Sequence, residues 1–357
     1  MKREAPLFMT VLSMILVFLN GCGGETSRLE YGDLNSLIDS VTVTPTTSGK
    51  YSLASGFFKK LAALRQAQGA DSAKSVLLTF FSHLHPKIRV TDSLAVLQIV
   101  EWIGNCFAQM DSGGVFYTNG AADTYGAWYL QQVEGIRPDL VVISLQFLVG
   151  PDYRQFLLDD TDICSALNLS EEDTLPLPPS TSETQDALAE IVTRQVSNPA
   201  HPPVYMAPSC GIQREFGEHL VDLGLVCAYQ DSAQSQGEIL DLLISGLTQR
   251  WQLRCASQGS PRDSSYAAQV AWLQYLTLLL RMVPVFEEQK RYQDMDMLFA
   301  HLEPVVGEDW RFPAVRYMHC HKSEEECRQY LERVKRYAAD HPDDHRVQGA
   351  LEQLERK

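Results

Sequence analysis

The sequence predicts an α/β fold in which a doubly wound, mostly parallel sheet is preceded by helices and followed by an α-helical hairpin domain. Four short apolar runs have the length and composition of buried strands: residues 114–118, 140–145, 204–206 and 225–229. Segments with helical periodicity separate these runs, and such alternation is typical of strands joined by right-handed crossovers. The regions before and after the runs carry helical patterns alone.

The chain is long enough to bury the cores of more than one domain. It has 357 residues, of which 45% are hydrophobic and 21% charged, and this composition is typical of a globular protein. The predicted organisation is a signal peptide, a Gly/Ser/Thr-rich flexible tether, a helical segment, the α/β domain and the helical-hairpin domain. Their boundaries are, in that order, residues 1–21, 22–50, 51–110, 111–232 and 233–357.

The first 21 residues have the pattern of a signal peptide. Lys2 and Arg3 precede an uncharged apolar run at residues 7–19 (LFMTVLSMILVFL), which is too short to span a bilayer comfortably. The sequence that follows, Leu-Asn-Gly-Cys, ends at Cys22 and resembles a lipobox, the signature of bacterial lipoproteins. This resemblance implies cleavage before Cys22 and attachment of lipid, such as palmitate, to that residue. The alternatives are a plain secretory signal and an N-terminal anchor helix with a chance cysteine.

The membrane and the compartment follow from the same resemblance. Cys22 is followed by Gly23, whereas an aspartate at this position resembles an inner-membrane retention signal. We therefore expect a lipid-anchored protein of the bacterial cell envelope, on the outer membrane and facing the periplasm. The formal net charge of −15 makes nucleic acid an improbable partner for the body of the protein.

The sequence predicts no cofactor and no metal site. It contains no phosphate-binding glycine loop and no paired-acid signature. His319, Cys320, His321 and Cys327 lie close together, but their spacing matches no common zinc pattern, and a helix end is the favoured context. Of the eight cysteines, those that remain after Cys22 are odd in number, so at least one stays free or pairs between chains.

A polar segment at the end of the first predicted strand is the candidate ligand site. Its residues are Thr118, Asn119, Asp123 and Thr124. Open α/β sheets bind ligands at the carboxyl ends of their strands, where short polar side chains and free helix amides can hold a hydroxyl or a carboxylate. In the alternative interpretation Asn119 makes the turn and Asp123 caps the next helix. Ser209 lacks the G-x-S-x-G context of a nucleophile elbow.

The same segment resembles a known family. Residues 117–140 read YTNGAADTYGAWYLQQVEGIRPDL. This run is similar to the soluble part of a large bacterial family of polytopic membrane proteins, the predicted protein O-mannosyltransferases. There it reads roughly T-N-G-D-N-D-T-x-x-x-W-Y-L-Q-x-V-E-G-x-R-x-D-V, and the resemblance covers about residues 95–230. Ala121 and Ala122 depart from it, because the family has an acid and an amide there.

The family's multi-span membrane half, which in such transferases holds the lipid-linked sugar donor and the catalytic acid, has no counterpart in this sequence. After residue 21 no run is apolar for long enough to supply it. The C-terminal region has a different resemblance. A His-Pro-Asp-Asp turn at residues 341–344 lies between two helical patterns, as in tetratricopeptide-type helical pairs, although no period of about 34 residues fits the region.

Together these features predict a membrane-anchored, periplasm-facing lipoprotein that binds or scaffolds proteins of the cell envelope without catalysis, with a link to protein glycosylation. Its expected partners are the membrane, through the lipid, and a protein. The alternative is a stand-alone enzyme or sugar-binding protein that acts near Asn119 and Asp123. A cleft of exposed polar side chains at these residues favours the enzyme, whereas side chains engaged in backbone caps favour the scaffold.

Overall fold

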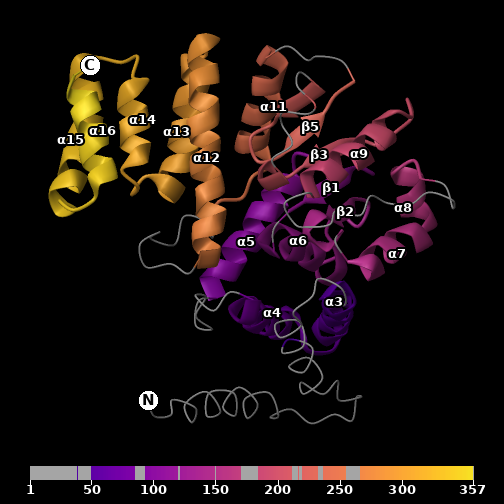
Figure 1. Cartoon of the computed structure of the whole chain (residues 1–357). Helices are drawn as coiled ribbons and strands as arrows, with labels where there is room; N and C mark the ends of the chain where they lie inside the picture. The colour runs from indigo at the N-terminus through magenta and orange to yellow at the C-terminus, as the bar shows by residue number, and fades with distance from the viewer. Residues whose placement is uncertain are drawn as a thin grey trace, which may run out of the picture.

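The structure is a computed structural model, and Figure 1 shows its helices and strands. It describes residues 38, 50–84, 93–119, 121–148, 150–169, 184–210, 216, 219–231, 236–254 and 266–356. The predicted signal peptide, the lipidation site Cys22 and almost all of the predicted tether lie outside the described residues.

Helices precede the sheet, and three of them lie in the described residues 50–84 and 93–107. They are α3 (Lys50–Gln68), α4 (Ala70–Leu84) and α5 (Ser93–Phe107). Gly69 lies between α3 and α4 with φ +91°, a left-handed conformation that glycine adopts without a steric penalty. The two helices pack through aromatic side chains, since the rings of Phe57 and Phe80 stack at 4.3 Å between centroids.

The sheet has five strands in the order β2-β1-β3-β5-β4. The strands are β1 (Val115–Thr118), β2 (Val141–Ser144), β3 (Val204–Met206), β4 (Leu220–Asp222) and β5 (Cys227–Tyr229). β1 pairs in parallel with β2 on one side and β3 on the other, and β5 is antiparallel to both β3 and β4. All four residues of β1 are buried, as expected for a central strand made only of apolar residues and threonine.

The predicted α/β class is confirmed, but the doubly wound, mostly parallel sheet is not. The sheet is mixed, because residues 220–229 form a β-hairpin where we predicted a helix ending near Gly224. Gly224 occupies the turn with φ +103°, and the Leu223 amide donates to the Val226 carbonyl at 2.9 Å. A short apolar run carries no information about the direction of its strand, so the sequence pattern did not distinguish a crossover from a hairpin.

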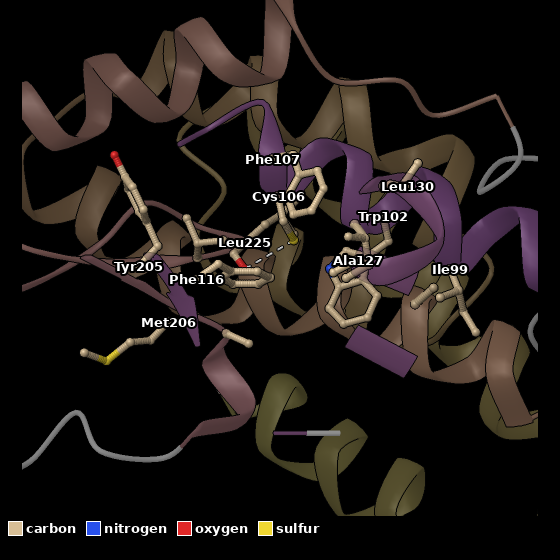
Figure 2. Packing of buried hydrophobic residues seen from close by; sticks show 14 of the residues in the cluster. Ile99, Trp102, Cys106, Phe107, Phe116, Ala127, Leu130, Tyr205, Met206 and Leu225 are labelled. Atoms are coloured by element: carbon tan, nitrogen blue, oxygen red, sulfur yellow. Dashed lines mark hydrogen bonds between the residues drawn. The ribbon is translucent and has the colours of Figure 1, made fainter. Parts of the chain in front are cut away.

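Among the described residues, four α-helices lie between the parallel strands. They are α6 (Ala121–Trp128), which continues into a π-helical turn at Tyr129–Val133, α7 (Pro151–Asp159), α8 (Thr161–Ala166) and α9 (Thr184–Val196). α5 covers the sheet with side chains at helical spacing, and Figure 2 shows Trp102, Cys106 and Phe107 directed toward Phe116 and Leu130. Cys106 Sγ donates to the Leu225 carbonyl at 3.7 Å, which ties α5 to the hairpin.

The C-terminal region is helical, as predicted. Its helices are α11 (Gln236–Gln249), α12 (Tyr266–Glu288), α13 (Tyr292–Val306), α14 (Arg311–Met318), α15 (Glu324–Asp340) and α16 (His345–Glu355). Residues 341–344 join α15 to α16, and the Asp344 side chain caps α16 by accepting from the Arg346 amide. Among the described helices, none combines the length and the apolar character needed to cross a membrane.

The buried apolar side chains form two clusters. The larger includes residues of α3, the sheet and the helices up to α14, so the sheet and α12 share one core. The smaller lies among α14, α15 and α16 and contains Ala314, Leu331, Val334 and Leu354. The predicted domain boundaries and the tetratricopeptide-like character of the helical pairs stay predictions.

Candidate functional site

The carboxyl ends of the three parallel strands bring a set of polar side chains together. Thr118 ends β1, Ser144 ends β2, and Ser209 follows β3 in the short helical turn Pro208–Cys210. The chain passes from β1 to its neighbour on one side and then to β3 on the other side. A reversal of this kind creates the crevice in which open α/β sheets bind ligands. We call Thr118, Asn119, Asp123, Thr124, Ser144 and Ser209 the strand-end cluster.

The inner half of the strand-end cluster is a buried chain of hydroxyl groups. Thr118, Thr124 and Ser144 are completely buried. Thr118 Oγ1 lies 2.8 Å from Thr124 Oγ1, and Thr124 Oγ1 donates to Ser144 Oγ at 3.1 Å. The Ser144 amide donates to the hydroxyl of Tyr153 at 2.9 Å, so a side chain of α7 lies at the end of this row of hydroxyl groups. Hydroxyl groups buried in this way are stabilising only because each one has a partner.

Asp123 is the buried acid of the strand-end cluster and is only 2% exposed. Its Oδ2 accepts from the Asn119 amide at 3.1 Å and from Ser209 Oγ at 2.9 Å. Its Oδ1 accepts from the Thr124 amide at 2.9 Å. Both oxygens are therefore engaged by groups of the protein itself.

The predicted role of Asp123 as the helix N-cap is wrong in detail. α6 begins at Ala121, two residues before Asp123, so the carboxylate lies inside the first turn and reaches back to the amide of Asn119. This reverse contact resembles one half of a capping box. The physical reason is local, because Ala121 and Ala122 favour helix and allow it to start earlier than an aspartate cap would.

Asn119 and Ser209 join the ends of β1 and β3. The Asn119 side-chain amide donates to the Ser209 carbonyl at 2.9 Å, and the Ser209 hydroxyl donates to Asp123. Ser209 is exposed and Asn119 is half-buried. Among the described residues no histidine hydrogen-bonds to Ser209, whose hydroxyl donates to the Asp123 carboxylate. The two bridging contacts link the carboxyl ends of β1 and β3, the edge at which open α/β sheets bind ligands.

Sequence reasoning found four members of the strand-end cluster and missed two. Ser144 was treated as part of a strand, and Ser209 was set aside because it lacks a nucleophile-elbow motif. A usable signal was present, since both serines come at or just after an apolar run. The carboxyl ends of parallel neighbours meet at one edge of a sheet, so residues at these positions are candidates for one site.

The C-terminal part of the family-like motif makes an ion pair and hydrogen bonds that link neighbouring elements. Glu134 Oε2 pairs with Arg65 of α3 at 2.6 Å, and its Oε1 accepts from the Tyr129 hydroxyl at 2.5 Å. Gln131 donates to the carbonyls of Arg137 and Leu140 at 2.9 and 2.7 Å. These side chains hold the connection between α6 and β2 in place.

Arg137 closes the carboxyl end of α5. Its guanidinium donates to the carbonyls of Phe107, Met110 and Asp111 at 2.7, 2.9 and 2.7 Å. It also pairs with Asp139 at 2.9 Å, and the hydrogen bonds from Arg137 hold the pKa of that carboxyl well below its usual range. Arg137 therefore makes one ion pair, and its other contacts are with backbone carbonyls at and just beyond the end of α5.

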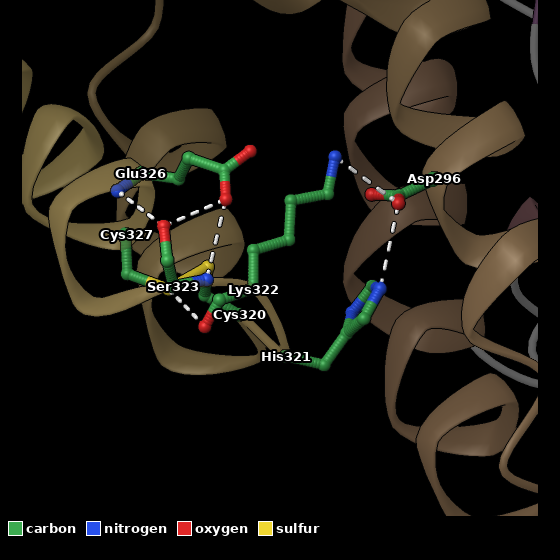
Figure 3. Close-up of a disulfide and its surroundings, with 7 residues drawn as sticks. All are labelled: Asp296, Cys320, His321, Lys322, Ser323, Glu326 and Cys327. Carbon is green, nitrogen blue, oxygen red and sulfur yellow. Dashed lines mark hydrogen bonds and ion pairs between the residues drawn. A yellow bond between two sulfur atoms is a disulfide. The ribbon is translucent and has the colours of Figure 1, made fainter.

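Cys320 and Cys327 of the C-terminal region form a disulfide. Figure 3 shows Cys320 bonded to Cys327, with His321 and Lys322 of the same loop directed at Asp296 of α13. His321 Nε2 and Lys322 Nζ lie 3.4 and 3.2 Å from Asp296 Oδ2. Because both sulfur atoms are in the disulfide, neither cysteine can serve as a thiolate ligand of zinc. Among the described residues, no group of three or more His, Cys, Asp or Glu side chains has a metal-binding arrangement.

Comparison with known proteins gives one match. Residues 102–171 match the family model described as TMEM260-associated domain 2. The matched stretch runs from α5 to just beyond α8 and contains Asp123 and Arg137. No curated protein and no solved structure matches the chain significantly. The chain thus contains, around its first two strands, a region similar to TMEM260-associated domain 2.

Proposed function

We propose that the protein is a lipid-anchored lipoprotein of the bacterial cell envelope, a periplasm-facing binding or scaffold protein without catalytic activity. One observation carries the proposal. The acid of the strand-end cluster is only 2% exposed, and Asn119, Thr124 and Ser209 supply donors to both of its oxygens. A general acid or base has to reach a substrate proton directly or through one water, and this carboxylate faces the protein instead.

The cysteine chemistry supports an exported protein. Cys320 and Cys327 are bonded to each other, and disulfides persist mainly in oxidising compartments such as the periplasm. Cys106, Cys210 and Cys227 are buried and are not disulfide-bonded, and burial protects their thiols from oxidation and exchange. Burial raises the pKa of Cys106 and Cys210 well above the usual thiol value, because the thiolate form would be desolvated.

A link to protein glycosylation is part of the proposal. TMEM260 is a predicted protein O-mannosyltransferase, and the matched region includes the strand-end cluster. Ala121 and Ala122 replace the acid and the amide of the family-like motif, so the cluster here retains Asp123 alone among those acids. We infer that the chain uses this region as a folded module and binds a protein of the glycosylation or assembly machinery.

One observation favours the alternative of a ligand-binding or catalytic site. Ser209 is exposed, and its hydroxyl lies 2.9 Å from the buried carboxylate of Asp123. If a saccharide displaced the Asn119 contact to Ser209, both groups would face it. In that case the charge of Asp123 would be essential, whereas the scaffold requires only that the cluster stays folded.

One experiment tests both the lipidation of Cys22 and the binding of a protein partner. Cells that express wild type, Cys22→Ser or Cys164→Ser are labelled with palmitate and treated with a cross-linker, and the protein is then purified from membranes. Cys164 is a free, partly buried cysteine and serves as the matched control. We expect label and the same cross-linked envelope protein with wild type and Cys164→Ser, and neither with Cys22→Ser. Normal labelling of Cys22→Ser, or the absence of any cross-linked partner, would contradict the proposal.

A further inference from the structure

A groove lies between α14 and α15, at the end of the molecule away from the sheet (Figure 1). Its volume is about 440 Å³, within the range of small-molecule sites. The side chains that line it and carry the argument are those of Glu308, Trp310, Pro313, Arg336, Tyr337 and Asp340. It is separate from the strand-end cluster, and the motif of the first two strands does not include it.

The walls of the groove are fixed by contacts within the protein. Arg333 donates to Glu303 Oε1 at 2.7 Å and to the Gly307 carbonyl at 2.8 Å, which joins α15 to the end of α13. On the same helix, the ring of Tyr337 stacks on His341 at 4.2 Å between centroids. A site with fixed walls loses little conformational entropy when a ligand binds.

Charged groups of both signs face the groove without pairing. Glu308, Arg336 and Asp340 are exposed, and none of them makes an ion pair or a side-chain hydrogen bond with any residue that the structure describes. Arg333, in contrast, is paired with Glu303 at 2.7 Å. A ligand with a net charge would be repelled by part of this lining. A neutral ligand whose hydroxyl groups both donate and accept can satisfy the carboxylates and the guanidinium together.

The aromatic side chains indicate the shape of such a ligand. Trp310 and Tyr337 are half-buried, and each contributes a ring to a lining that also contains Pro313 and charged side chains. The face of an aromatic ring attracts weakly positive C–H groups. Molecules that combine flat C–H faces with a rim of hydroxyl groups are saccharides. We propose that this groove binds a neutral saccharide.

An extended peptide fits the groove less well. Peptides that bind as strands need free backbone donors and acceptors on the protein. At Gly307 both backbone groups are already used, because its carbonyl accepts from Arg333 and its amide donates to the Glu303 carbonyl at 2.8 Å. The groove therefore offers side chains and aromatic surface, as a saccharide requires.

The experiment applies the full-length protein, purified in detergent, to an array of neutral oligosaccharides, sialylated and uronate-containing oligosaccharides, and basic and acidic peptides. We compare wild type with the double variant Arg336→Met, Asp340→Asn. The matched control is Glu352→Gln, Arg356→Met, which removes one carboxylate and one guanidinium from an exposed pair on α16. Unchanged melting temperatures would show that both variants are folded, as expected for exposed side chains.

We expect wild type and the α16 control to bind a subset of the neutral oligosaccharides. The groove variant should bind them at least about tenfold more weakly, because Arg336→Met removes the guanidinium donors and Asp340→Asn replaces a charged acceptor by a weaker neutral one. Binding to no oligosaccharide, binding to charged oligosaccharides or peptides alone, or equal binding by the groove variant would overturn the proposal. The array measures direct binding, so its failure is distinct from the absence of a cross-linked partner in cells.

Discussion

Replacement of Trp128 by alanine is expected to lower the free energy of unfolding by about 3–5 kcal/mol. Trp128 is 5% exposed and stacks on Phe147 at 5.6 Å between centroids. Its edge contacts Tyr51 and Phe58 of α3 at 5.8 and 6.2 Å between centroids. The indole thus joins α6 to α3 and to the end of β2, and its removal leaves a cavity among rigid rings that cannot collapse to fill it.

Chemical denaturation followed by circular dichroism measures this effect. Trp128→Phe keeps an aromatic surface and should cost less than Trp128→Ala. Leu242→Ala is the control for a large apolar side chain that is exposed, and it should leave stability within about 0.5 kcal/mol of wild type. A Trp128→Ala protein as stable as wild type would show that α6 does not pack in this way.

Arg137→Ala is expected to cost about 2–3 kcal/mol, because three carbonyls at the end of α5 lose a charged donor. The side chain is 26% exposed, so water partly compensates and the effect stays below that of Trp128. Arg137→Lys should recover only part of the loss, since an ammonium group cannot reproduce the fork of the guanidinium.

The backbone of Arg137 provides a second comparison. Its φ is +51°, a left-handed conformation that is unfavourable for a residue with a side chain, and it precedes Pro138. Arg137→Gly loses the same hydrogen bonds as Arg137→Ala but relieves this strain, so it should be more stable than the alanine variant by about 1 kcal/mol. The control is Arg328→Ala, which removes an exposed ion pair on α15 and should be close to wild type. Equal stabilities of Arg137→Ala and wild type would show that the hydrogen bonds of Arg137 do not stabilise the end of α5.

Much of the fold could be predicted because it depends on local pattern. The run at residues 140–145 is apolar enough to mark a strand, and the His-Pro-Asp-Asp turn marks the boundary between α15 and α16. The hairpin at residues 220–229 could not be predicted in the same way. Its strand β4 is three residues long, and only the pairing with β5 distinguishes it from a helix end.

The strand-end cluster was predictable in part for the same reason. Thr118, Asn119, Asp123 and Thr124 are close in sequence, so a strand followed by a helix places them together. Ser209 joins them only because β3 lies beside β1, and the order of strands is not a local property. Arg137 is a similar case, since its role depends on where α5 ends in space. These long-range contacts determine that the polar groups of the cluster hydrogen-bond to one another.

Asp123→Asn tests the central claim most directly. The amide retains the size of the carboxylate and one oxygen acceptor, whereas Asp123→Ala leaves the donors of Asn119, Thr124 and Ser209 without a partner and should cost about 1–3 kcal/mol. The measurement is complementation of a deletion strain by Asp123→Asn, at a temperature well below the melting temperature of the variant protein. A scaffold needs the fold and not the charge, so we predict full complementation. A stable Asp123→Asn protein that fails to complement would contradict the account and identify a working carboxylate at the end of β1.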